Sequence, residues 1–205
     1  MKILLATNNQ SKIARVRMLL KDADVEFVTT SDVGLESIEV EEGSDIRENA
    51  KNKALAYRGK TELPIIGMDS ALVIPGEDLD PARVKRNALG DRDEATMTQQ
   101  EIRDAMILFY QTIVKRHGEP VGAYWEDVSA LVMPDGTVTI ESGQRPIVIT
   151  GEIHGPVNDF YPLRSMYQVA ATGKYPIEQT PEEEWVELAP FREALERLLG
   201  LSVGS

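Results

Sequence analysis

The sequence predicts an α/β fold with a mixed β-sheet, and three patterns support this. Apolar segments at residues 2–6 and 25–30 enclose a helical pattern, and two strands joined through a helix form a parallel pair. A hairpin pattern at residues 123–142 adds antiparallel strands. Amphipathic segments between the strands supply helices to cover the sheet. A chain of 205 residues is long enough for one large domain or two small lobes around one core, and we expect a single domain over residues 1–205.

In the first half of the chain, the apolar run at the N-terminus is followed by a helix at residues 11–21. Asn9 or Ser11 is the expected cap of this helix, because both side chains can accept a hydrogen bond from a free backbone N–H group. A second helix is expected at residues 45–59, where apolar side chains recur along one face. Residues 63–75 predict one or two buried strands that carry a lone acid.

The second half contains a long polar segment, residues 76–97, which exceeds an ordinary connection and predicts a lid, an interface loop or a partly ordered flap. The remaining expected segments are a helix at 98–116, the hairpin at 123–142 with its turn at Pro134, Asp135 and Gly136, a strand at 145–153, an irregular stretch at 155–180 and a closing helix at 190–199.

Composition excludes several classes of function. The chain is 42% hydrophobic and 27% charged, as in ordinary globular proteins, and its net charge of −12 disfavours nucleic acids and anionic membranes as partners. It contains no cysteine, which excludes disulfides and thiolate chemistry and fits a reducing cytoplasm. No run approaches the ~20 apolar residues of a membrane span, and the opening run is shorter than a secretory signal.

The first candidate for chemistry is the turn between the first strand and the first helix, with Thr7, Asn8, Asn9 and Lys12. A helix N-terminus directs free N–H groups and a partial positive charge at a bound anion, and Lys12 would add a full charge. The ordinary structural interpretation is that the asparagines cap the helix and Lys12 is solvated. The Walker A pattern is absent.

The second candidate is an acidic segment ahead of the second helix, with Glu41, Glu42 and Glu48, followed by Asn49 and Lys53. Carboxylates in this setting could hold Mg²⁺, which prefers oxygen ligands and keeps several waters. The alternative is an acidic loop that places favourable negative charge at the first turn of a helix.

The third candidate is Asp69, which lies between two apolar β-like runs and is followed by Ser70. A buried carboxylate is costly without a partner, so such a residue is often a ligand, a general base or a turn cap. Ser70 could donate a hydrogen bond to a ligand or cap a turn.

Other polar and aromatic side chains carry weaker signals. We expect structural roles for His117, at a helix end, and His154, in a turn. Trp125 is expected in the core or at an interface. Phe160 and Tyr161 lie in the irregular segment, where they could stack on a nucleobase.

These candidates follow one another in a familiar order. Residues 7–12 (Thr-Asn-Asn-Gln-Ser-Lys) are similar to Thr-Gly-Asn-x-x-Lys, residues 41–42 to an acidic pair, residues 48–50 with Lys53 to Glu-Asn-Ala and a lysine, and residues 68–72 (Met-Asp-Ser-Ala-Leu) to Asp-Asp-Ser-Gly-Leu. The sequence therefore resembles the inosine triphosphate pyrophosphatase family, whose members hydrolyse non-standard purine nucleoside triphosphates. The resemblance extends to about residue 156.

The chain departs from this family mainly in its last third. Residues 158–162 (Asn-Asp-Phe-Tyr-Pro) replace the Phe-Gly-Tyr-Asp-Pro segment, and residues 189–191 (Ala-Pro-Phe) replace a Ser-His-Arg motif that helps read the purine. Met68 replaces one acid, and Asn8 replaces a glycine. The phosphate and metal motifs are mostly kept and the base-reading motifs mostly lost, so the resemblance implies a changed choice of base.

The resemblance implies Mg²⁺ near Glu41 and Asp69, phosphate held by Lys12, Lys53 and the backbone after Thr7, and Asp69 as the residue that orients or deprotonates a water. The implied products are a nucleoside monophosphate and pyrophosphate. The implied substrate-binding residues are Thr7, Asn8, Asn9, Lys12, Lys53, Ser70, Phe160 and Tyr161.

The resemblance also implies a two-lobed fold with the active cleft between the lobes, and a homodimer. Two other functions stay open on the residues: a non-catalytic nucleotide-binding regulator, and a hydrolase of another phosphorylated metabolite.

Overall fold

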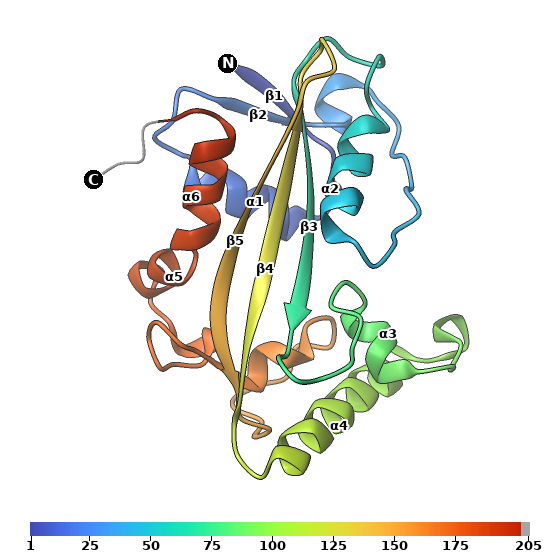
Figure 1. The fold of residues 1–205 in the computed structure, drawn as a ribbon, viewed down its shortest axis with the longest axis vertical. Helices are drawn as coiled ribbons and strands as arrows, with labels where there is room; N and C mark the ends of the chain where they lie inside the picture. The colour runs from blue at the N-terminus through green and yellow to red at the C-terminus, as the bar shows by residue number, and fades with distance from the viewer. Residues whose placement is uncertain (202–205) are drawn as a thin grey trace. The chain divides into compact units, whose positions relative to one another are not determined.

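A six-stranded mixed sheet with flanking helices forms the framework of the protein, in a computed structural model that describes residues 1–201 (Figure 1). The strands are β1 (Lys2–Leu5), β2 (Glu26–Thr29), β3 (Ile65–Val73), β4 (Val121–Val132), β5 (Val138–Ile149) and β6 (Tyr167–Val169), in the order β2-β1-β3-β4-β5-β6. The helices are α1 (Gln10–Leu19), α2 (Ile46–Leu55), α3 (Val84–Leu89), α4 (Gln99–His117), α5 (Pro181–Glu187) and α6 (Ala189–Leu198). Single 3-10 turns lie at Ser31–Val33, Glu94–Thr96, Pro162–Ser165 and Pro176–Glu178.

The strand pairing confirms the α/β class and the mixed sheet. β1 pairs in parallel with β2 and with β3, and Leu4 lies opposite both Val28 and Ile65. β5 and β6 are antiparallel, with Ile147 opposite Val169. The parallel β1–β2 pair is the one that the opening strand–helix–strand pattern predicts.

The chain divides into two compact units, each with its own core. Of the described residues, unit 1 comprises 1–70, 126–144 and 188–201, and unit 2 comprises 71–125 and 145–187. Buried aliphatic side chains such as Leu4, Ile65 and Val132 form a core in unit 1, and α4 packs its apolar stripe into the core of unit 2. The prediction of one domain over residues 1–205 stays a prediction.

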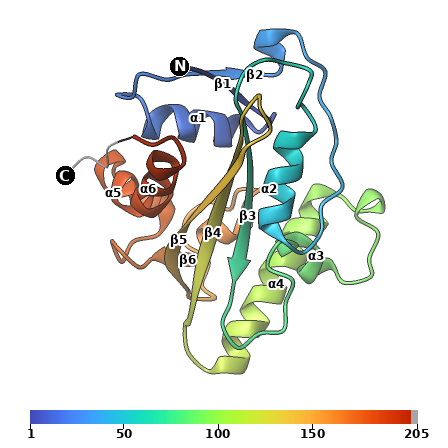
Figure 2. The same ribbon diagram turned by 45° about the horizontal axis from the view of Figure 1, so that its top comes forward.

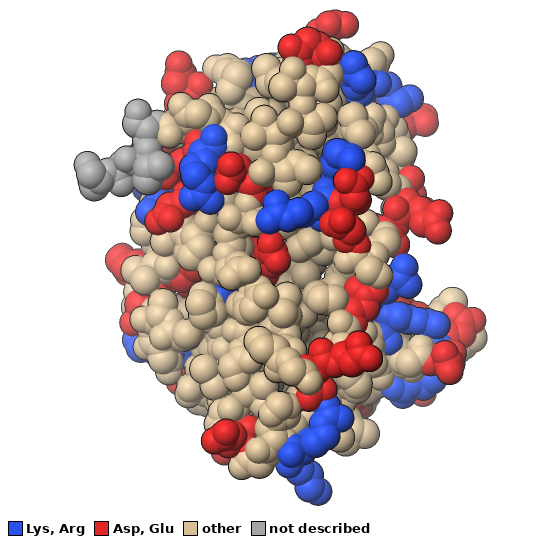
Figure 3. Space-filling view, viewed as in Figure 1, with Lys and Arg blue, Asp and Glu red and all other residues tan. Residues whose placement is uncertain are grey.

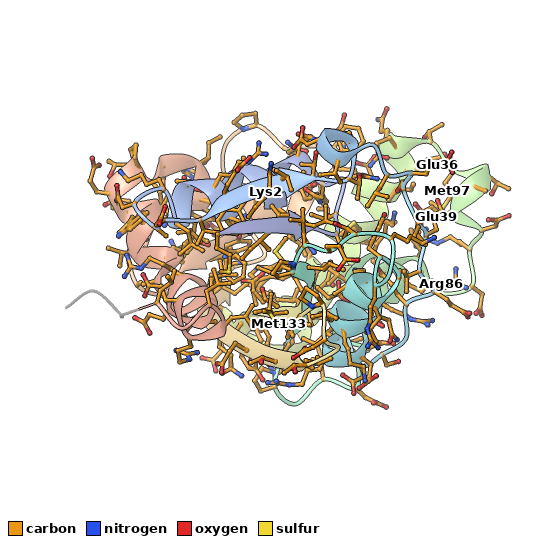
Figure 4. All side chains as sticks on the ribbon, turned by 90° about the horizontal axis from the view of Figure 1, so that it is seen from above. Lys2, Glu36, Glu39, Arg86, Met97 and Met133 are labelled. Carbon is orange, nitrogen blue, oxygen red and sulfur yellow. The ribbon has the colours of Figure 1, made fainter. Side chains whose placement is uncertain are left out.

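The hairpin is longer than the sequence indicated. Met133, labelled in Figure 4, begins its turn, where the backbone N–H of Gly136 donates to the Met133 carbonyl oxygen at 2.9 Å. The expected strand at residues 145–153 is not separate: residues 145–149 are the second half of β5. Gly143 does not break the strand. It leaves room for the backbone of Pro190, whose carbonyl oxygen would lie 2.2 Å from an added Cβ.

Three segments are more regular than their composition indicated. Residues 76–97 contain α3 and a 3-10 turn, held in part by the Asn87 side chain, which donates to the Asp80 carbonyl oxygen at 2.7 Å. The stretch at 155–180 contains β6, and α5 precedes the closing helix. Pro181 and a run of acidic residues begin α5, as suits a helix N-terminus.

In unit 1, β3 lies between helices, with α2 on one face of the sheet and α1 and α6 on the other (Figures 1 and 2). Successive side chains of a strand point to opposite faces. Gly67 and Asp69 therefore face α2, whereas Met68 and Ser70 face the other side. This alternation decides which helix each candidate residue of β3 can meet.

Charges of both signs are interspersed on the face shown in Figure 3. On the face shown in Figure 3, lysines and arginines lie among acidic side chains and form no continuous basic stripe. Within residues 1–201, the helices lack the combination of length and apolar character needed to cross a bilayer.

Gly67 is the point of closest approach between β3 and α2, and it yields a test of the fold. A Cβ at this position would lie 2.1 Å from the carbonyl oxygen of Ala50 and 2.7 Å from the backbone nitrogen of Ala54. Gly67→Ala should lower the free energy of unfolding by about 2 kcal/mol, because the helix backbone must move. Gly122→Ala in β4, where an added Cβ meets nothing within 4 Å, should stay within about 0.5 kcal/mol of wild type. Urea denaturation measures both, and equal effects would contradict the close packing.

Candidate active site

The turn before α1 is held by its own polar side chains. Asn9 caps the helix, its side-chain oxygen accepting from the backbone N–H of Lys12 at 3.1 Å, as predicted. The hydroxyl of Thr7 accepts from the backbone N–H of Asn9 at 3.2 Å. Asn8 donates to the Ser37 hydroxyl at 2.6 Å and accepts from the Thr30 hydroxyl at 3.2 Å. These side-chain contacts hold the turn in place. The N-terminus of α1 stays directed at the open end of this turn.

Asp69 is the centre of a second polar group. Its carboxylate is 8% exposed and accepts from the Asn49 amide at 2.9 Å and from the Lys53 ammonium at 3.0 Å, one partner on each oxygen. Both partners come from α2, four residues apart and therefore on one helix face. A buried carboxylate is costly unless it is paired, and these two contacts supply the pairing.

Lys53 also holds the acidic segment. Its ammonium lies 2.6 Å from the Glu42 carboxylate, so it bridges Glu42 and Asp69. Burial lowers the pKa of Lys53, but the hydrogen bond with Glu42 and the charge of Asp69 outweigh burial and leave the pKa above its usual value. Lys53 is therefore a permanent cation at neutral pH.

Asn49 ties this segment to Asp69. It is 2% exposed, accepts from the Gly43 N–H at 2.8 Å and donates to the Gly43 carbonyl oxygen at 2.9 Å. One amide therefore fixes both the loop ahead of α2 and the carboxylate on β3. Glu36 and Glu39, labelled in Figure 4, lie on the same connection between β2 and α2.

Lys12 differs from Lys53 in its surroundings. In the part of the chain that the structure describes, no hydrogen bond or ion pair joins its ammonium to another side chain. Burial and the nearby charge of Lys53 lower its pKa, while the charges of Asp69, Asp127 and Glu42 oppose this. A desolvated ammonium without a close partner is suited to receive an anion.

These groups line one polar cavity of about 450 Å³ in unit 1. It brings together six of the predicted site residues: Thr7, Asn8, Asn9, Lys12, Lys53 and Asp69. Ser70 lines a smaller neighbouring cavity, and Glu41 is exposed and is not among the residues lining either one. Glu48 is also exposed and pairs with Lys51.

Phe160 and Tyr161 lie in unit 2, on a separate apolar cavity of about 270 Å³. Their side chains are 73% and 49% exposed, and Trp125 and Tyr167 line the same cavity. Flat aromatic surfaces of this kind suit a planar ring.

The two histidines have structural partners, as predicted. His117 ends α4 and its Nε2 lies 2.8 Å from the Glu77 carboxylate. The ring of His154 stacks on Tyr175, with the ring centroids 4.4 Å apart.

Two buried polar residues have contacts that the sequence does not indicate. Asn49 belongs to the second candidate segment, but its contact with Asp69 depends on tertiary packing. Asp127 is buried on β4 and accepts from the Ser70 hydroxyl at 2.7 Å. Like Asp69, it precedes an apolar run, but it lacks the apolar run ahead of it and lies inside the predicted hairpin.

The donors fit a magnesium ion better than a metal enclosed by protein. Among residues 1–201, no group of three or more His, Asp or Glu side chains is placed to hold a metal. The carboxylates of Glu42 and Asp69 nevertheless lie near each other, because both contact the Lys53 ammonium. Two carboxylates are what Mg²⁺ needs when phosphates and waters complete its shell.

The surroundings of Lys12 predict a trade between stability and binding. Because the folded-state pKa of Lys12 is lowered, the folded protein disfavours its charged form, and removing the charge should help folding. Lys12→Met should raise the free energy of unfolding at pH 7 by about 1 kcal/mol, and the gain should shrink as pH rises from the lowered folded-state pKa toward 10.5, the ordinary pKa of a lysine.

Lys60→Met, at an exposed position, is the matched control and should leave stability unchanged. Denaturation at several pH values measures the difference. A Lys12→Met protein less stable than wild type at pH 7 would contradict this account.

Comparison with known proteins gives the same result as the motifs. Residues 3–159 match the Ham1 family. A dITP/XTP pyrophosphatase of Yersinia pseudotuberculosis is 30% identical over 185 residues, which cover 89% of each chain. One of Nocardia farcinica is 31% identical over 150 residues, which cover 71% of this chain and 68% of the relative.

Solved structures agree on the fold. A HAM1 protein from Coxiella burnetii superposes with a TM-score of 0.75 at 23% identity and covers 98% of both chains. The match over residues 3–159 and the similarity to the Yersinia protein settle the family that the motifs indicated, and the chain belongs to the Ham1 family.

Proposed function

We propose that this protein is a Mg²⁺-dependent pyrophosphatase that hydrolyses a nucleoside triphosphate to a monophosphate and pyrophosphate. The observation that carries the proposal is the polar cavity of unit 1, where an unpaired Lys12 and the N-terminus of α1 meet a buried, doubly hydrogen-bonded Asp69. Two relatives named dITP/XTP pyrophosphatases support it.

The cations of the cavity hold the triphosphate. Lys12 has no competing ion pair and binds phosphate oxygens together with the backbone N–H groups at the start of α1. Lys53 exchanges its half-exposed partner Glu42 for phosphate while it keeps Asp69. A bound Mg²⁺, held by Asp69 and an acid of the 41–42 pair, would neutralise charge on the phosphates.

Asp69 acts as the base. With one partner fixed on each oxygen, its carboxylate is held in a single orientation and keeps a lone pair for a water molecule. The water oxygen attacks the α-phosphorus, its proton passes to Asp69, and the bond from the α-phosphorus to the bridging oxygen breaks. Pyrophosphate leaves with that electron pair, and the monophosphate remains.

Base recognition differs from that of the family. Phe191, in the place of the missing Ser-His-Arg motif, is 5% exposed and belongs to the interior. The apolar cavity of unit 2 supports Phe160 and Tyr161 as residues that contact the base. Homodimerisation and a cytoplasmic location stay predictions.

Replacement of the base tests the mechanism. Asp69→Asn should lower pyrophosphate release by about 100- to 10,000-fold, because an amide cannot take the proton from water. Asn keeps one oxygen that can accept from Lys53 but turns an NH2 group toward the donor amide of Asn49, so the melting temperature should fall by a few degrees while the variant stays folded at the assay temperature. Asp22→Asn, at an exposed position, is the matched control with full activity expected.

The assay is pyrophosphate and phosphate release from a panel of standard, inosine and xanthosine triphosphates and their deoxy forms, with Mg²⁺ and with a chelator. Retained turnover in Asp69→Asn would contradict the assigned role. Thermal stabilisation of the wild type by nucleotides without any product would favour a regulator, and phosphate release only from other metabolites would favour another hydrolase.

A further inference from the structure

Asp127 is a buried acid that the mechanism above does not use. It is 3% exposed on β4, and the side chains that follow it, Val128, Ser129 and Ala130, are fully buried. An apolar residue would fit this position at lower cost, because burying a carboxylate costs several kcal/mol unless partners compensate it. The contacts of Asp127 should therefore explain why a carboxylate is present at this buried position.

The hydroxyl of Ser70 is one partner. Ser70 Oγ donates to Asp127 Oδ1 at 2.7 Å, a hydrogen bond strengthened by the charge of the acceptor. A serine hydroxyl has one proton to donate in hydrogen bonds, and in Ser70 this proton is used in the hydrogen bond to Asp127. Toward any other group, the Ser70 oxygen can therefore act only as an acceptor. This excludes the expected donation from Ser70 to a ligand while the bond persists.

This pair lies beside the polar cavity of unit 1, which is called the phosphate cavity below because the proposed function places the phosphates there. Asp127 and Ser70 line a small cavity together with Lys12 and Asp69, and Lys12 and Asp69 also line the main cavity. Ser70 follows Asp69 directly in β3, so the Asp127 hydrogen bond fixes the strand next to the base. The charge of Asp127 also acts on Lys12, where it offsets part of the effect of burial.

On the face of β3 opposite α2, the residues on either side of Asp69 are Met68, which is 3% exposed, and Ser70. Neither is an acid, so β3 itself contributes no carboxylate there. We propose that Asp127 is a positioning residue of the phosphate cavity: through Ser70 it fixes β3 beside Asp69, and through its charge it moderates the attraction of Lys12 for phosphate. The inference rests on the proposed function, since it assigns Asp127 to the same site.

Two substitutions separate the two effects. Asp127→Asn keeps an oxygen that can accept from Ser70 but removes the negative charge near Lys12. Ser70→Ala keeps the charge but removes the hydrogen bond. Glu126→Gln is the matched control, because it removes a charge from the adjacent residue of β4, which pairs with Arg47 at 3.5 Å and lines neither cavity.

Binding of inorganic tripolyphosphate with Mg²⁺, measured by calorimetry, tests the charge without depending on turnover or on the base. Asp127→Asn should bind about fivefold more tightly than wild type, because the anion no longer meets the field of Asp127. Glu126→Gln should match wild type. Equal affinities of Asp127→Asn and Glu126→Gln would overturn the proposal.

Steady-state pyrophosphate release tests the positioning. Ser70→Ala should lower kcat about tenfold with KM unchanged, whereas Asp127→Asn should lower KM and keep kcat within about threefold. A purely structural role would lower the melting temperature of both variants without this split between kcat and KM, and would overturn the proposal. A wild type that binds tripolyphosphate but releases no pyrophosphate would contradict the proposed function alone, and the calorimetric comparison would still decide the role of Asp127.

Discussion

The buried carboxylate of Asp69 is the constraint on which the site depends. It must be paired, and its partners Asn49 and Lys53 both come from α2. That pairing requires the helix backbone to approach β3 closely, which the absence of a side chain at Gly67 permits. Asn49 and Lys53 also hold Gly43 and Glu42, so the same contacts position the acidic segment over the cavity.

The sequence predicted the fold class and most elements, because periodicity and turn residues are local signals. It predicted a break between residues 142 and 145 where β5 continues, since Gly143 looks like a turn but in fact accommodates the backbone of Pro190. It assigned no element to residues 181–187, which form α5. The motifs identified Lys12, Lys53 and Asp69 as site residues, and the structure places all three in one cavity. The contacts of Asn49 and the burial of Asp127 depend on tertiary packing, which local patterns do not reveal.

The two units contain cavities of different chemical character. The polar cavity of unit 1 contains the side chains that the motifs assign to phosphate and metal, and an acidic protein can still bind a polyanion there because Lys12 and Lys53 act locally. The apolar cavity of unit 2 has aromatic walls and a sequence that departs from the family. Under the proposed function, the residues expected to contact the base are therefore different from those expected to carry the hydrolysis step.

The position of bond cleavage tests the central claim most directly. The reaction is run with Mg²⁺ in ¹⁸O-labelled water, on the triphosphate that the protein turns over fastest, and mass spectrometry locates the label. Attack on the α-phosphorus with Asp69 as the base predicts the label in the monophosphate and none in the pyrophosphate. Label in the released phosphate or pyrophosphate would contradict this account of the cavity.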